Sequence, residues 1–122
     1  MENIFQLDLV SWAMDRALAS HTVSRINVAN VNTKNFVPLK LDFSEQLRNI
    51  DSELKSHSSN YNIKFASIDQ MMEQNTIERS GETVELDFEV SQMVRSSGYY
   101  QSLASIMSRK IGLMRMAVSN HS

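Results

Sequence analysis

The chain has 122 residues, no cysteine and a formal net charge of −2. The lack of cysteine excludes a disulfide framework and a thiolate metal site, and the balanced charge argues against the dense basic surface of a nucleic-acid-binding protein. With 42% hydrophobic residues but only three glycines and one proline, the composition favours a single, mainly helical domain over a turn-rich sandwich or barrel.

The N-terminal segment, residues 1–33, reads as one long helix. We do not expect it to be a secretory signal, because Glu2, Asp8 and Asp15 interrupt it and no basic start precedes an apolar core. Alternating three- and four-residue steps form a heptad-like seam, in which six of eight positions are apolar. The seam consists of Leu7, Val10, Met14, Ala17, His21, Ser24, Val28 and Val31.

The stretch INVANVNTKNF, residues 26–36, ends this helix with four asparagines. Asparagine is a poor helix former because its side chain competes for backbone hydrogen bonds. Two interpretations remain open at this point. Either the asparagines terminate the helix locally, or Asn27, Asn30 and Asn32 bond backbone groups of an adjacent chain and fix its register.

The middle segment, residues 34–83, is mixed. Phe43, Leu47, Ile50 and Leu54 share one helical face after a possible cap at Asp42 or Ser44, which predicts a short amphipathic helix. HSSN at 57–60 predicts a turn, YNIKF at 61–65 alternates like a half-buried strand, and ERSGET at 78–83 predicts a loop.

The C-terminal segment, residues 84–122, carries the strongest helical pattern, from about residue 85 to 118. Its seam is Leu86, Val90, Met93, Ser97, Tyr100, Ala104, Met107, Ile111, Met114 and Val118, and a second stripe holds Leu103, Ile106, Leu113 and Ala117. Such a helix would be about 50 Å long at 1.5 Å per residue, too long for a globule with a radius of gyration of about 14 Å. We therefore expect a mainly α fold, an elongated, coiled-coil-like antiparallel pair of long N- and C-terminal helices with a small irregular α/β middle segment.

Catalysis is poorly supported by the sequence. His21, His57 and His121 fall in different segments, and no metalloprotease, phosphate-loop or nucleophile-elbow motif is present. The acidic residues Glu82, Glu85, Asp87 and Glu89 suit the positive end of a helix dipole better than a metal site. We expect no enzyme activity, no cofactor and no bound metal.

Two motifs resemble bacterial flagellar proteins. INVANVNT resembles the N-terminal signature of the flagellar rod and hook family, in which a helix ends in Asn-x-Ala-Asn-x-x-Thr before Pro-Gly-Tyr or Pro-Gly-Phe. The matching residues are Asn27, Ala29, Asn30, Thr33 and Phe36. Lys34 and Asn35 replace the usual Pro-Gly, so we expect the tight turn after the helix to differ from the Pro-Gly turn.

The second motif begins GETVELDFEVSQ and resembles the C-terminal region of the FlgB family of basal-body rod proteins. The matching residues are Gly81, Val84, Asp87, Glu89, Tyr100 and Gln101. Glu82 and Glu85 stand where that family usually has Asn and Asp, and Ser96 stands where it often has Asn. The sibling FlgC family is the nearest alternative.

The resemblance implies a structural subunit of the proximal rod, exported without a cleaved signal peptide and assembled in the periplasm. In that family the terminal helices pair and stack into a tube, a helical hetero-oligomer, with the middle segment outside. The implied partners are further copies, FlgC-like rod subunits, a FliE-like adaptor and the flagellar export gate, with no nucleic acid and no direct membrane insertion.

We expect the assembly contacts to involve Asn27, Ala29, Asn30, Asn32, Thr33, Leu86, Val90, Met93, Tyr100, Gln101, Met107, Ile111 and Met114. A helical export chaperone or adaptor, and a rod or adaptor subunit of a type III injection apparatus, remain alternatives.

Overall fold

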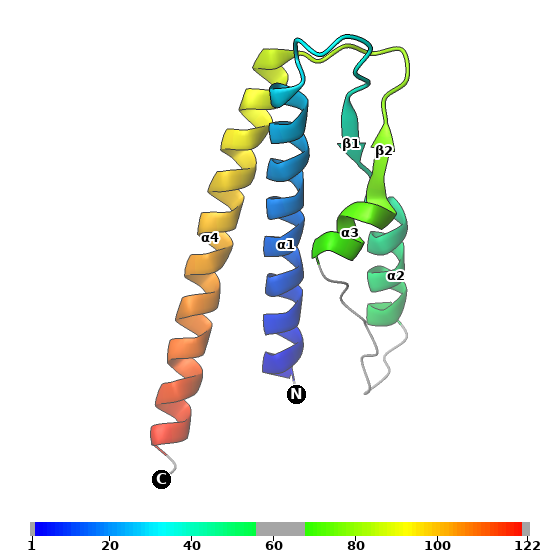
Figure 1. Ribbon diagram of the computed structural model, residues 1–122. Helices are drawn as coiled ribbons and strands as arrows, with labels where there is room; N and C mark the ends of the chain where they lie inside the picture. Colours follow the sequence, from blue (N-terminus) through cyan, green and yellow to red (C-terminus); the bar gives the residue numbers. More distant parts are fainter. Residues whose placement is uncertain (1, 56–67, 121–122) are drawn as a thin grey trace.

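The computed structural model describes residues 2–55 and 68–120. Its elements, in chain order, are α1 (Glu2–Ala29), β1 (Leu39–Leu41), α2 (Ser44–Lys55), α3 (Ile68–Asn75), β2 (Thr76–Glu78) and α4 (Leu86–Ser119). Figure 1 shows three layers, with α4 on one side of α1 and the two strands, α2 and α3 on the other. The long helices α1 and α4 run antiparallel, so the expected mainly α, elongated helix pair with a small middle segment is confirmed.

The central helix α1 is covered on two faces. One face packs Trp12 and Ala19 against Phe43, Ile50 and Met71, which together form the buried core. The rings of Trp12 and Phe43 meet edge to face with their centroids 6.4 Å apart, a favourable aromatic geometry.

The other face of α1 carries the predicted seam. Its positions from Leu7 to Val28 are half-buried or buried, whereas Val31 is exposed beyond the helix end. Small residues bring α1 and α4 close together, and the Ser96 hydroxyl on α4 donates to the Ser20 hydroxyl at 3.1 Å. The N-terminal seam is therefore the side of α1 that meets α4.

The predicted extent of α4 is confirmed, but the first half of the predicted seam lies only partly on its inward face, because Met93 and Ser97 are half-buried and Tyr100 is exposed. Its most buried side chains are Glu89 and Ser96, whereas Leu86 and Val90 remain 47% and 45% exposed. The inward face follows positions 89, 93, 96, 103, 107 and 114. At positions 89 and 96 polar groups occupy this face because each has a partner on another element, whereas Leu86 and Val90 lie to one side.

The middle segment contains the predicted amphipathic helix as α2. The Asp42 carboxylate accepts hydrogen bonds from the Ser44 backbone N–H and hydroxyl, and these bonds hold the pKa of Asp42 below its usual value. Phe43 and Ile50 are buried, and Leu47 is partly exposed at the edge of that face. The loop predicted at 78–83 is present after Glu78, the last residue of β2.

Three elements were not predicted. They are α3 and the two short strands, which pair antiparallel with Leu39 opposite Glu78 and Leu41 opposite Thr76. The predicted turn at 57–60 and strand at 61–65 lie outside the described residues. Within the described ranges, no helix is both long enough and apolar enough to cross a membrane.

Candidate assembly interface

The two motif segments lie at the same end of the molecule, where α1 ends and α4 begins (Figure 1). A fully buried side chain, that of Asn27, joins them. Its amide N–H donates to the Leu39 carbonyl at 2.8 Å and to the Glu89 carboxylate at 3.1 Å, and its carbonyl oxygen accepts from the Leu39 N–H at 2.9 Å. One amide group therefore ties α1 to β1 and to α4.

Arg79 completes this network from the loop after β2. Its guanidinium donates to the Glu89 carboxylate at 2.7 Å and to the Leu39 carbonyl at 3.3 Å. The carboxylate of Glu89 is only 2% exposed, and a charge removed from water to that degree needs a paired, hydrogen-bonded partner. Asn27, Leu39, Arg79 and Glu89 form one unit, which we call the motif clamp.

The clamp corrects the docking hypothesis for Asn27. Its side chain is saturated within its own chain and is inaccessible to a neighbour. Asn30 is half-buried, donates to the Ile26 carbonyl at 2.9 Å and accepts from the Thr33 hydroxyl at 3.0 Å, which is local helix termination. Ala29, Asn32 and Thr33 are exposed and remain candidates for contacts between chains.

A hydrogen-bonded turn follows α1, although Lys34 and Asn35 stand at its centre in place of Pro-Gly. The Phe36 N–H donates to the Thr33 carbonyl at 3.3 Å, and Asn35 has a φ of 63°. Within the described residues it is the one non-glycine residue with positive φ, so Lys34 does not share that conformation. A positive φ at the third turn position alone is the type II pattern, and asparagine tolerates it better than most residues.

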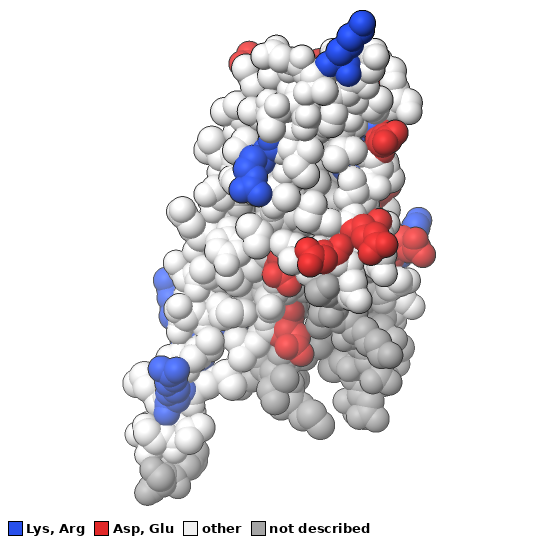
Figure 2. All heavy atoms as spheres, viewed as in Figure 1, with Lys and Arg blue, Asp and Glu red and all other residues white. Residues whose placement is uncertain are grey.

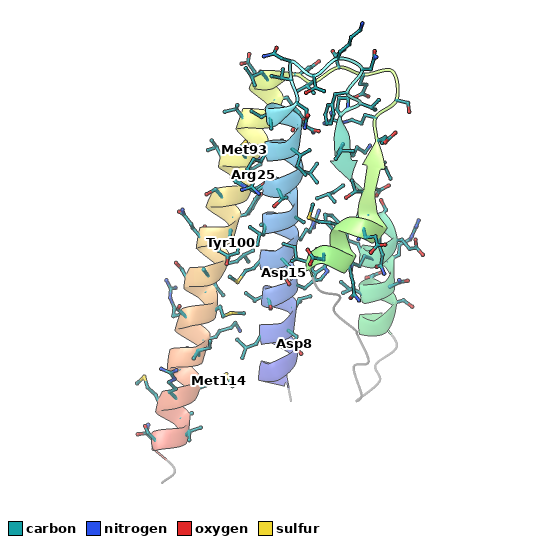
Figure 3. All side chains as sticks on the ribbon, in the orientation of Figure 1. Asp8, Asp15, Arg25, Met93, Tyr100 and Met114 are labelled. Carbon is teal, nitrogen blue, oxygen red and sulfur yellow. The ribbon has the colours of Figure 1, made fainter. Side chains whose placement is uncertain are left out.

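Most apolar side chains on α4 beyond its inward face are partly or largely exposed. Val94 is 70% exposed, Tyr99 62%, Leu113 62% and Val118 73%. Of the predicted contact residues, Met93, Met107 and Met114 are half-buried against α1, whereas Leu86, Val90, Tyr100, Gln101 and Ile111 are exposed. Figure 3 shows Met93, Tyr100 and Met114 along the side of α4 that borders α1.

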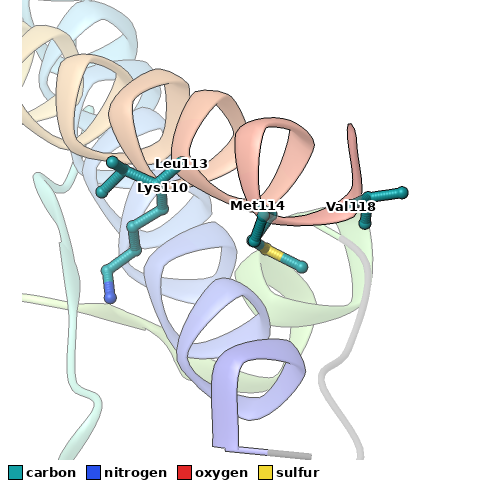
Figure 4. A pocket seen from close by; sticks show the side chains of 5 residues that line it. Lys110, Leu113, Met114 and Val118 are labelled. Carbon is teal, nitrogen blue, oxygen red and sulfur yellow. The ribbon is translucent and has the colours of Figure 1, made fainter. Parts of the chain in front are cut away.

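The far end of α4 is apolar and hollowed. Leu113, Met114, Ala117 and Val118 line a depression of about 450 Å³ beside Lys110 (Figure 4). A second hollow of about 440 Å³ lies between this end of α4 and Leu7 of α1. Both hollows are suited to the side chains of a packing partner, and filling them requires no chemical step.

Charged groups do not form a metal site in the described part of the chain, where no three His, Cys, Asp or Glu side chains cluster suitably. Two of the acidic residues near the start of α4 are engaged by Arg79, namely Glu89 at 2.7 Å and Glu82 at 3.5 Å. In Figure 2 acidic groups gather over α1 and the middle segment, and basic groups are spread along the α4 side.

No family model, curated protein or solved structure matches the chain.

Proposed function

We propose that this chain is a structural subunit of the proximal rod of the bacterial flagellar basal body, of the FlgB type, which polymerises by helix packing. The observation that carries the proposal is the hydrogen bond between Asn27 and Glu89, residues 62 positions apart. Each belongs to one of the two segments that resemble rod proteins. Two motifs that share one role would be expected to meet in the fold, and the motif clamp is their meeting point.

The one-sided packing of α4 supports a role in assembly. This helix has 34 residues and contacts its own chain mainly through α1. It leaves large apolar side chains exposed along its length. Many large apolar side chains exposed on one helix are a feature of surfaces that pack against partners. Fully burying one such side chain contributes about 1.5–3 kcal/mol, so a few of them per contact stabilise a polymer substantially.

The proposed mechanism is packing, with no chemical step. Repeating one contact around a non-closing screw operation produces a tube. The partners we propose are further copies, FlgC-like rod subunits, a FliE-like adaptor and the flagellar export gate, in the periplasmic part of the basal body. Met107 and Met114 would offer adaptable surface where neighbouring contacts differ.

Deletion of the gene tests this proposal. We expect non-motile cells whose isolated basal bodies have a membrane ring but no rod, and we expect the wild-type gene on a plasmid to restore both rod and swimming. Normal rods in the deletion strain would reject the rod function. A deletion strain that makes the rod subunits but fails to export them would favour a chaperone instead.

A further inference from the structure

A groove runs along one side of the α1–α4 pair, and we call this side the groove face. It consists of two hollows of about 460 and 330 Å³, which share the lining residues Arg16, Ser20 and Gln92. The part of its floor formed by α1 is made of small side chains, Ala13, Ala17 and Ser20, over which a foreign helix can approach closely. Its α4 wall adds Phe88 and Tyr99, which are 45% and 62% exposed.

The groove face is basic. The guanidinium of Arg16 lies over the Phe43 ring at 5.0 Å and the Trp12 ring at 5.9 Å, so its position is held by two aromatic faces. Arg95 and Lys40 are exposed on either side of the groove. No described carboxylate lies within ion-pair distance of Arg95.

The opposite side of α1, which we call the acidic face, carries Asp8 and Asp15. At about 100° per residue, Asp8 lies about 180° around the helix from Ala17. Figure 3 labels Asp8 and Asp15 on the side of α1 towards the viewer, where Figure 2 shows acidic groups at the surface. Burial raises the pKa of Asp15, and none of the described residues forms an ion pair with either carboxylate.

We propose that the groove face of one copy receives the acidic face of a second copy, with Asp8 and Asp15 of one chain opposite Arg16 and Arg95 of the next. Two different faces meet in such a contact, so it is heterologous and propagates to a ring or an open helix and not to a closed dimer. This inference rests on the proposed rod function, from which it takes the assumption that the chain polymerises. It adds which two surfaces meet and which charges pair them.

Cysteine cross-linking tests the contact directly, because the native chain has no cysteine. Ser11 is exposed on the acidic side of α1, and Gln92 lines the groove. In cells that carry the S11C/Q92C chain, a short bis-maleimide linker should produce a ladder of dimers, trimers and larger species. Each single-cysteine chain should stay monomeric, and the matched pair S11C/S52C, with Ser52 exposed on α2, should give no ladder.

A missing ladder in cells that build normal rods would overturn this contact and leave the rod function standing. Dimers of a single-cysteine chain would indicate a symmetric contact and would also overturn it. If the S11C/Q92C chain gives a ladder but the deletion strain still builds rods, the contact is supported and the rod function is rejected.

Charge reversal gives a second test on the same surfaces. R16E/R95E should abolish the S11C/Q92C ladder, and so should D8K/D15K, because each places like charges opposite one another. Combining all four substitutions restores opposite charges at both pairs and should restore the ladder. Failure of the combined variant to recover, with a wild-type circular dichroism spectrum, would contradict the proposed pairing.

Discussion

Replacing Asn27 with alanine should destabilise the fold far more than replacing Asn30. Asn27→Ala removes three hydrogen bonds, leaves the partly buried Leu39 N–H without its acceptor, and takes one donor from the buried Glu89 carboxylate. An orphaned buried donor costs about 1–3 kcal/mol and a bond to a charged group about 1.5–3 kcal/mol, so we expect a loss of about 3–5 kcal/mol. That is a large part of the 5–15 kcal/mol that typically stabilises a small domain.

Urea unfolding of the purified chain measures this loss, and Asn30→Ala is the matched control. Asn30 bonds only within its own helix end and the turn after it, so its replacement should cost about 1 kcal/mol or less. Hydrogen exchange at the Leu39 amide should also accelerate in Asn27→Ala, because that N–H loses its acceptor. Equal unfolding midpoints for the two variants would refute the reasoning about the motif clamp.

Three further predictions concern single side chains. Val94→Asp, at a site that is 70% exposed, should change the free energy of unfolding by no more than about 0.5 kcal/mol yet reduce motility, and unchanged swimming would remove this flank of α4 from the interface. Asn35→Ala should destabilise by about 1–2 kcal/mol, measured by urea unfolding, because alanine lacks asparagine's tolerance of a φ of 63°. Asp15→Asn should raise stability at pH 7 and lose that advantage at acid pH, because the raised pKa of Asp15 penalises the folded state only where the carboxylate is ionised; a pH-independent difference in urea midpoints would contradict this.

Met107→Asp is a less direct test of assembly than Val94→Asp, although Met107 belongs to the predicted seam. In the fold Met107 is half-buried on the inward face of α4. A charge there would disturb the α1–α4 contact itself, so Val94→Asp is the cleaner test of packing between chains.

The long helices could be predicted because their apolar periodicity is local. The helix predicted from about 85 to 118 is found at Leu86–Ser119, and Asp42 marks the start of α2 as its position suggested. The two strands could not be predicted, since each has three residues and exists through a pairing of Leu39–Leu41 with Thr76–Glu78 across the middle segment. Neither strand alone is long enough to show an alternating pattern.

The inward face of α4 could not be predicted either, because it too depends on contacts with other elements. With apolar residues on several sides of this helix, periodicity alone does not choose a face. The choice depends on Glu89 and Ser96, polar residues whose partners Asn27 and Ser20 lie on α1. Arg79 lies in the loop predicted at 78–83, and it becomes important only because the strand pair brings it to Glu89.

Imaging of the native assembly tests the central claim most directly. Basal bodies isolated from the wild-type bacterium would be analysed by mass spectrometry and electron cryo-microscopy. We predict that this chain is present and that its α1–α4 pair repeats around the proximal rod tube, next to the export gate. A fully assigned rod that contains no copy of this chain would contradict the account.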